Sequence, residues 1–227
     1  MPLSIIETKL KKTQFTKNGC GNLTELDTGK ELVEDLLNIA RSGEKLVTMK
    51  LLTYKIEKAG KKFAKNADSK YYSELYNQFV GDWFEAFAEY FFKTCSNNGQ
   101  YGITCYEAVN NQKDWGVDGF GYCADERESS GGKTPCVVQV KFRSNQMDEI
   151  SYTCLAKTFA DGVKHYELDP KRKNNVILFC NTENGANYLA KEALGDNLYV
   201  IDKRSLDKDM TGIKTVSFWE GFLEHWV

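Results

Sequence analysis

The spacing of apolar residues divides this chain of 227 residues into a helical first part and a later part that mixes strands with helices. Up to residue 95, apolar residues recur about every three or four positions, which is the period of a helix with one buried face. From residue 101, apolar and polar residues alternate in short runs, which is the period of a β-strand. The expected helices cover residues 30–40, 46–65, 73–95, 148–166, 185–194 and 217–227, and the expected strands cover residues 101–109, 117–124, 136–142, 174–181 and 197–206.

The order of these elements indicates the fold class. Three strands follow one another as a meander, and each of the two later strands follows a helix. That order is typical of parallel strands joined by right-handed crossovers. We therefore predict an α/β domain with a mixed central sheet over residues 71–227. Residues 1–70 are expected to form a separate helical N-terminal segment.

The composition fits a folded soluble protein, because 41% of the residues are hydrophobic and 13% are aromatic. No run of about 18 apolar residues exists, so a membrane span is not expected. The chain is expected in the cytoplasm, or in the interior of a host cell if a phage or virus encodes it. Its seven cysteines are scattered without the spacing of disulfide frameworks or zinc sites, so we expect reduced thiols.

Positive charge is concentrated in the N-terminal segment, although the whole chain has a net charge of −2. Residues 41–70 contain nine basic residues and three acidic residues. Such segregation indicates either a surface that contacts nucleic-acid phosphates or a solvated helix face. In the first interpretation, Lys58, Lys61 and Lys62 are the expected DNA contacts. Both interpretations stay open at this point.

The third expected strand contains two polar residues that a buried strand does not need. Gln139 and Lys141 stand in the otherwise apolar run VVQVKF, and both lie on one face because strand side chains alternate. Desolvating an ammonium group is costly unless it is paired. Asp118 precedes the adjacent strand, between Gly116 and Gly119, which allow a ligand or backbone to come close. These polar residues form a candidate site, unless Asp118 caps a turn and the other two face solvent from an edge strand.

Two other patterns do not indicate a site. The run SGGKT at residues 130–134 lacks the earlier glycine and the following helix of a phosphate-binding loop, so we expect a hairpin loop. His165 and His225 stand at the ends of expected helices, without partners arranged for nucleophilic catalysis.

Three short motifs, taken in their order, resemble the PD-(D/E)xK nuclease superfamily. They are GDWFEAFAEYFF in the long helix, DWGVDGF before the second strand and VVQVKFRS in the third strand. The Mrr-like restriction-endonuclease domains are the most similar group, because a Gln there commonly replaces the first carboxylate of the final dyad and gives a Q-x-K motif. The resemblance covers roughly residues 75–225. It implies a restriction-endonuclease-like mixed sheet flanked by helices, with an N-terminal helical appendage.

The resemblance also implies a role for each matched residue. Asp118 would be the central metal-binding carboxylate, and Gln139 would offer its side-chain oxygen to the same Mg²⁺ ion, for which Mn²⁺ would substitute. Lys141 would orient or polarise the attacking water. Glu85 matches the helix acid, with a role at the metal, and Glu89 is the alternative one turn later. Three residues that follow the strand are expected to touch the DNA backbone: Arg143, Ser144 and Asn145.

These roles predict a Mg²⁺-dependent endonuclease that hydrolyses phosphodiester bonds in double-stranded DNA, most simply a restriction-type enzyme acting as a homodimer. Three alternatives stay open. A structure-selective nuclease, such as a junction resolvase or a recombination nuclease, would share the fold. A non-catalytic DNA-binding module on a decayed nuclease fold would lack the activity. A helical partner-binding protein built around residues 27–65 would use the rest of the chain as a scaffold.

Overall fold

The computed structural model describes residues 3, 5–6, 25–43, 46–65, 71–95, 103–109, 116–124, 133–209 and 214–226. The chain forms two compact units, one from Met1–Ala86 with Asp207–Val227 and the other from Phe87–Leu206. Helix α3 (Tyr72–Cys95) contributes residues to both units. The expected division at residue 70 lies before this helix, so a separate N-terminal domain stays a prediction.

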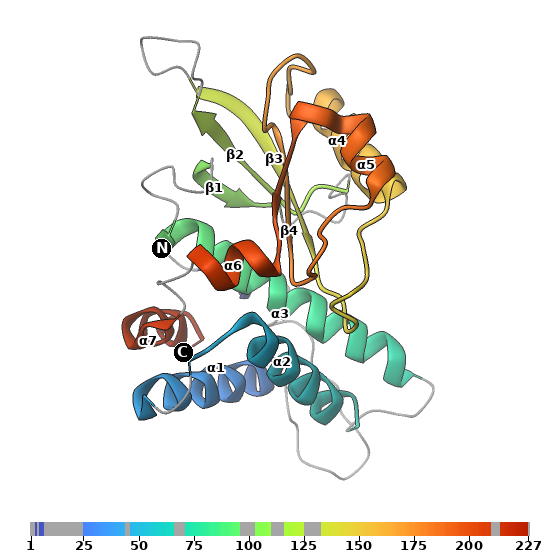
Figure 1. The fold of residues 1–227 in the computed structure, drawn as a ribbon. Coiled ribbons are helices and arrows are strands. Elements are labelled where there is room, and N and C mark those ends of the chain that lie inside the picture. The colour runs from blue at the N-terminus through green and yellow to red at the C-terminus, as the bar shows by residue number, and fades with distance from the viewer. Residues whose placement is uncertain are drawn as a thin grey trace. The chain divides into compact units, whose positions relative to one another are not determined.

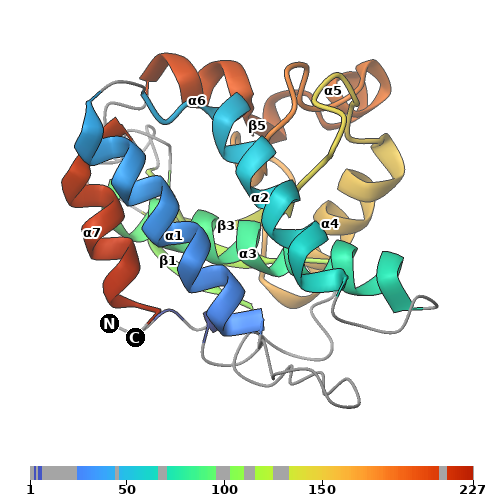
Figure 2. The ribbon, with the colours of Figure 1, turned by 90° about the horizontal axis from the view of Figure 1, so that it is seen from below.

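The first unit is helical. Helix α1 (Glu25–Ser42) lies beside both α2 (Met49–Ala64) and α7 (Val216–Glu224), as Figure 2 shows. Leucines recur on the buried face of α1, as the apolar spacing predicts, and Leu36 is fully buried. The helix begins earlier than expected, at Glu25.

The second unit contains a five-stranded mixed sheet with the strand order β1-β2-β3-β4-β5. The strands are β1 (Thr104–Ala108), β2 (Gly119–Ala124), β3 (Lys133–Lys141), β4 (Val176–Cys180) and β5 (Leu198–Ile201). The first three strands pair antiparallel, and β3, β4 and β5 pair parallel. This topology confirms the predicted α/β fold, with a meander followed by parallel strands.

Helices cover both faces of this sheet within the second unit. Leu178 of β4 packs against Leu155 of α4 (Tyr152–His165) and Ala190 of α5 (Tyr188–Leu194). These two helices lie side by side in Figure 1. The next residue of β4, Phe179, points to the opposite face, where its ring centroid lies 5.4 Å from that of Phe91 in α3. The strand is therefore buried on both sides, as its continuous apolar run predicts.

Two expected elements are wrong in part. The run 197–206 was predicted as one strand, but β5 ends at Ile201 and helix α6 (Lys203–Asp209) follows. The carboxylate of Asp202 accepts hydrogen bonds from the N–H and the hydroxyl of Ser205, both at 2.9 Å, and so caps the start of this helix. The second difference concerns the expected hairpin loop at residues 130–134. Strand β3 begins at Lys133, so residues 133–134 belong to the strand and not to the loop.

Candidate functional site

Asp118 is held immediately before β2 by its backbone and by two flanking glycines. Its N–H donates to the carbonyl of Val138 at 2.9 Å, and only 8% of the residue is exposed. Gly116 has a φ of 70°, in the left-handed region that favours glycine. A Cβ at Gly119 would lie 2.3 Å from the ring of Tyr106, so a larger residue does not fit there. The two glycines therefore permit the turn that places the carboxylate.

Three donors surround one oxygen of this carboxylate. The N–H of Val140 donates to Asp118 Oδ2 at 2.7 Å, the side-chain amide of Gln139 donates to the same oxygen, and Lys141 Nζ lies 3.7 Å away. The register of β2 against β3 pairs Gly119 with Val138, which sets residue 118 beside residues 139–141. The structure thus brings together the three residues that the sequence singled out.

The edge-strand interpretation of these residues is wrong. Strand β3 lies between β2 and β4, and Gln139 is only 3% exposed. The side chain of Lys141 is 27% exposed, so its ammonium group reaches solvent from a central strand. A buried amide and a partly buried ammonium on one face of a central strand are unusual, because both groups lose hydration there.

The amide of Gln139 is held on its other side by Thr158 of α4. The Thr158 hydroxyl lies 2.7 Å from Gln139 Oε1, 2.8 Å from the carbonyl oxygen of Gly116 and 3.2 Å from that of Cys154. A hydroxyl has a single proton to donate. All three neighbours are acceptors in this arrangement, so Thr158 satisfies one of them at a time.

The reversed orientation of the Gln139 amide would give the Thr158 hydroxyl a donor as well as an acceptor, but it would remove the hydrogen bond that Nε2 donates to Asp118. With the amide turned about its last bond, Nε2 donates to the Thr158 hydroxyl, and the hydroxyl proton goes to the Gly116 carbonyl. The oxygen and nitrogen of an amide exchange places in this way with almost no change in the space they fill. The same turn sets Oε1 against Asp118 Oδ2, an arrangement that a bound cation would stabilise. In that orientation Gln139 and Asp118 would offer the oxygen ligands that a hard divalent cation such as Mg²⁺ prefers.

This donor set contains a single carboxylate. In the described part of the chain, no group of three or more His, Cys, Asp or Glu residues could hold a metal ion. The helix acid of the resemblance therefore matters. Glu85 is half-buried and belongs to the first unit, whereas Glu89 is fully buried in the second unit and pairs with Lys93 at 2.6 Å. The second unit thus contains both Asp118 and Glu89, and the metal-binding role of Glu85 stays a prediction.

The three residues expected to touch the DNA backbone differ in their surroundings. The backbone N–H of Arg143 donates to Asn181 Oδ1, and its carbonyl accepts from Asn181 Nδ2, each at 2.7 Å. Ser144 is exposed. The side chain of Asn145 is exposed too, but it donates to Asp148 at 2.7 Å within a local turn. Their DNA contacts stay predictions.

Sequence reasoning missed two side chains of α4 that lie at the site. Thr158 is fully buried against Gln139. Asp161 has a buried oxygen, Oδ2, that makes no hydrogen bond among the described residues and lies 3.5 Å from the Cβ position of Gly116. Both residues follow Cys154 at helical spacing, which makes a polar row on an amphipathic helix. That row is the signal that could have found them.

The thiol of Cys180, the residue paired with Lys141 in the sheet, does not provide a nucleophile. Cys180 of β4 pairs in register with Lys141. Burial raises the pKa of the Cys180 thiol to about 11. A hydrogen bond with Cys123, together with burial, raises the pKa of the Cys136 thiol well above its ordinary value. Both thiols are therefore protonated near neutral pH, and the thiolate is the reactive form.

Comparison with known protein families and with curated proteins finds no match for this chain. Among solved structures, the chain is similar to the MspJI restriction endonuclease in complex with a 27-mer oligonucleotide, with 15% sequence identity and a TM-score of 0.41. That match covers 96% of this chain and 38% of MspJI. A DNA modification-dependent restriction endonuclease, AspBHI, matches with 11% identity and a TM-score of 0.37 over 53% of this chain and 30% of AspBHI. The chain thus spans well under half the length of either enzyme.

No helix in the described ranges combines the length and the apolar character that a membrane-spanning helix requires.

Proposed function

We propose that this chain hydrolyses phosphodiester bonds in double-stranded DNA with a bound divalent cation, as a restriction-type endonuclease. The observation that supports the proposal is the convergence of a backbone N–H, a side-chain amide and an ammonium group on the Asp118 carboxylate, beside a central strand of the sheet. The negative charge of a phosphodiester repels an attacking hydroxide ion. A site that hydrolyses it therefore needs both a cation and a fixed positive side chain.

Asp118 and Gln139 are the proposed ligands of the cation, which we expect to be Mg²⁺, with Mn²⁺ as a substitute. When bound, the ion would neutralise phosphate charge and lower the pKa of a bound water. Asp118 contributes the negative charge. Gln139 contributes a neutral oxygen when its amide is turned so that Oε1, in place of Nε2, faces Asp118. A pair of this kind has one negative charge fewer than two carboxylates, so we expect modest metal affinity and occupancy by one ion.

Lys141 supplies the fixed positive charge. Its backbone lies in the ladder between β3 and β4, where it pairs with Cys180, while its ammonium group remains partly exposed. This combination lets the ammonium group contact water and a phosphate oxygen from a rigid base. Lys141 would orient the attacking water and stabilise the charge that builds on the phosphate oxygens in the transition state. Glu85 is the proposed helix acid that completes the ligand set.

Cleavage of both strands of a duplex requires two such sites or two successive events at one site. A homodimer would supply two sites, and we propose this assembly for the active enzyme. A structure-selective nuclease is the alternative that uses the same residues. It would cut a four-way junction in preference to a plain duplex.

The test is a cleavage assay on linear duplex, supercoiled plasmid and four-way junction DNA, each with Mg²⁺, Mn²⁺ or EDTA. One duplex should contain modified bases, because one similar structure is that of a DNA modification-dependent enzyme. We expect cleavage with either metal, none in EDTA and none by the Asp118→Asn variant. Preference for the junction would favour the structure-selective alternative. Metal-independent cleavage, or full activity of Asp118→Asn, would contradict the proposed site.

A further inference from the structure

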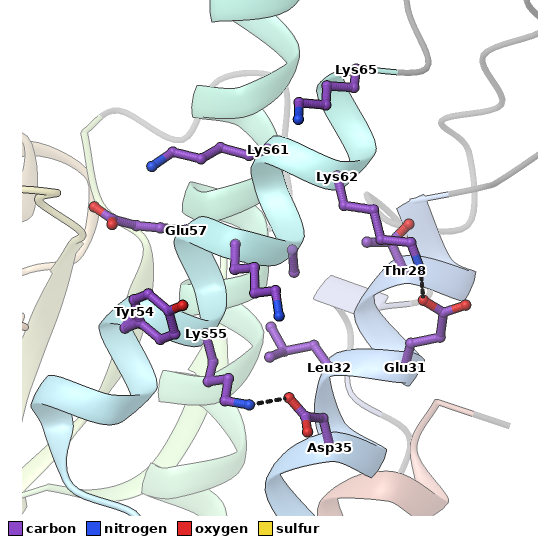
Figure 3. A pocket seen from close by; sticks show the side chains of 12 residues that line it. Thr28, Glu31, Leu32, Asp35, Tyr54, Lys55, Glu57, Lys61, Lys62 and Lys65 are labelled. Carbon is purple, nitrogen blue, oxygen red and sulfur yellow. Dashed lines mark hydrogen bonds and ion pairs between the residues drawn. The ribbon is translucent and has the colours of Figure 1, made fainter.

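Helices α1 and α2 enclose an open groove of about 750 Å³ in the first unit. Five lysines and three acidic residues line this groove. Four of the lysines belong to α2, and the fifth, Lys65, is its C-cap residue. Figure 3 shows these side chains together with the two ion pairs that cross between the helices. The charges are not mixed evenly, because the lysines of α2 divide into two sets.

The first set pairs with α1. Lys55 Nζ lies 2.6 Å from the carboxylate of Asp35, and Lys62 forms an ion pair with Glu31. In Figure 3 both lysines extend from α2 toward α1, where dashed lines join them to these acids. Their positive charge is therefore largely compensated within the protein. This arrangement leaves little charge for a ligand at Lys62, which the sequence had singled out as a DNA contact.

The second set makes no ion pair with α1, although Lys58, Lys61 and Lys65 also line the groove. Lys50, Lys58, Lys61 and Lys65 are exposed, and their ammonium groups have no hydrogen-bond or ion-pair partner among the described residues. In Figure 3, Lys61 points away from α1. Tyr54, on the same side of the helix, is 58% exposed. We call these five residues the α2 basic stripe.

Helix geometry places the α2 basic stripe in one narrow band. With about 3.6 residues per turn, Lys50, Tyr54, Lys58, Lys61 and Lys65 fall within an arc of about 80°. At a rise of about 1.5 Å per residue, the stripe is about 22 Å long. Like charges at such spacing repel one another and weaken an isolated helix. Glu57, four residues before Lys61, borders the stripe, so its four lysines retain an excess of about three positive charges.

We propose that the α2 basic stripe binds the sugar–phosphate backbone of duplex DNA. This inference depends on the proposed function, because it identifies a second contact surface for the same substrate. Duplex DNA has about one negative charge per 1.7 Å of its axis, so a row of lysines about 22 Å long faces a continuous line of phosphates. An exposed tyrosine among the lysines adds a ring that packs on sugars or bases. The charge pattern suits this polyanion, whereas the α1 side of α2 presents paired charges.

The experiment compares three variants in DNA-binding titrations with a labelled linear duplex, performed in EDTA so that the DNA stays intact. The first variant, Lys58→Gln/Lys61→Gln/Lys65→Gln, removes three charges of the α2 basic stripe. Each lysine–phosphate contact contributes a slope of about −0.9 to the dependence of log affinity on log salt concentration. We therefore expect this variant to lose about 3 units of slope and on the order of 10²-fold in affinity at low salt.

Two matched variants control for charge and for folding. Lys164→Gln/Lys171→Gln/Lys208→Gln removes three exposed lysines elsewhere and should retain the wild-type slope. Lys58→Arg/Lys61→Arg/Lys65→Arg retains the positive charges of the stripe and should retain the affinity as well. Thermal unfolding of each variant shows that the fold is intact.

The outcomes separate this inference from the proposed function. If the glutamine variant of the α2 basic stripe binds DNA with the wild-type slope, the stripe is not a DNA contact, whereas cleavage by the wild-type protein still supports the nuclease. If polyglutamate binds the wild-type protein more tightly than DNA and depends on the same lysines, the stripe recognises an acidic polypeptide and the inference is wrong. If the wild-type protein neither binds nor cuts DNA, the proposed function itself fails.

Discussion

The hydroxyl of Thr158 lies 2.7 Å from the side-chain oxygen of Gln139, and this contact joins helix α4 to the polar end of β3. Two carbonyl oxygens share the same hydroxyl, so the environment favours an amide nitrogen at this position. In the structure the Gln139 nitrogen faces Asp118, and we propose that Thr158 also holds the amide when it is turned so that its oxygen points to Asp118. It acts as a positioning residue for a proposed metal ligand, without contact to the substrate.

The substitution Thr158→Val tests this relationship, because valine keeps the shape of the side chain and removes the hydroxyl. Partners of metal ligands typically contribute about 10- to 100-fold to metal affinity, and we expect a loss in this range. The measurement is Mn²⁺ binding to the DNA-free protein by electron paramagnetic resonance. Thr158→Ser restores a hydroxyl and should restore binding. Unchanged Mn²⁺ affinity in the valine variant would show that Thr158 does not position the amide.

Lys141→Ala should separate catalysis from binding. The ammonium group is proposed to act on charge that develops only in the transition state. Its loss should lower the cleavage rate on the order of 10²- to 10³-fold, while DNA affinity changes less than about tenfold. Single-turnover cleavage and an equilibrium titration measure the two quantities. Equal losses in rate and affinity would instead make Lys141 a residue that only binds DNA.

The two helix acids are distinguished by activity and stability together. Glu85 is the proposed helix acid, so Glu85→Gln should lower cleavage at least tenfold. Because Glu85 is half-buried, the same substitution should change the free energy of unfolding by less than about 0.5 kcal/mol. Glu89 is fully buried and pairs with Lys93, so Glu89→Gln should cost about 1–3 kcal/mol of stability. Urea unfolding and cleavage rates are the measurements. Wild-type cleavage by Glu85→Gln would transfer the catalytic role to Glu89.

The sequence could predict that Asp118, Gln139 and Lys141 lie together, because they belong to two strands that follow one another in the chain and pair. Strand alternation puts the last two on one face, and an adjacent antiparallel strand brings the first beside them. Thr158 was not predictable in this way, because its place depends on which face of α4 packs on the sheet. The sequence did not predict helix α6, because its residues continue a run that resembles a single strand. In the structure Asp202 follows the end of β5 and caps the first turn of α6. Side-chain contacts of this kind do not follow from hydrophobic period alone.

Alkaline pH should destabilise the fold through a buried thiol. Burial raises the pKa of the Cys180 thiol from 9.0 to about 11. Below about pH 9 both the folded and the unfolded chain hold this proton, and the full stability is present. As the pH rises toward about 11, the unfolded chain releases the proton first, so the free energy of unfolding falls.

The variant Cys180→Ala removes this titration. We expect its stability to fall less steeply over the same pH range, with a difference from the wild-type protein on the order of 2 kcal/mol at the alkaline end. Urea unfolding at a series of pH values measures both curves. Cys105→Ala provides the matched control, because it removes an exposed cysteine instead of a buried one. Parallel curves for Cys180→Ala and the wild-type protein would contradict the prediction.

The contact between Asn181 and Arg143 has a consequence for how sequences of this kind can diversify. The amide of Asn181 takes the place of a neighbouring strand for one residue, since it satisfies both backbone groups of Arg143. The backbone at Arg143 is therefore anchored independently of the segment 144–149 that follows, in which every residue except the half-buried Gln146 is exposed. Substitutions in that segment would leave the position of the lysine unchanged. On the proposed function, related chains could therefore change the DNA contacts of this segment without rebuilding the proposed site beside it.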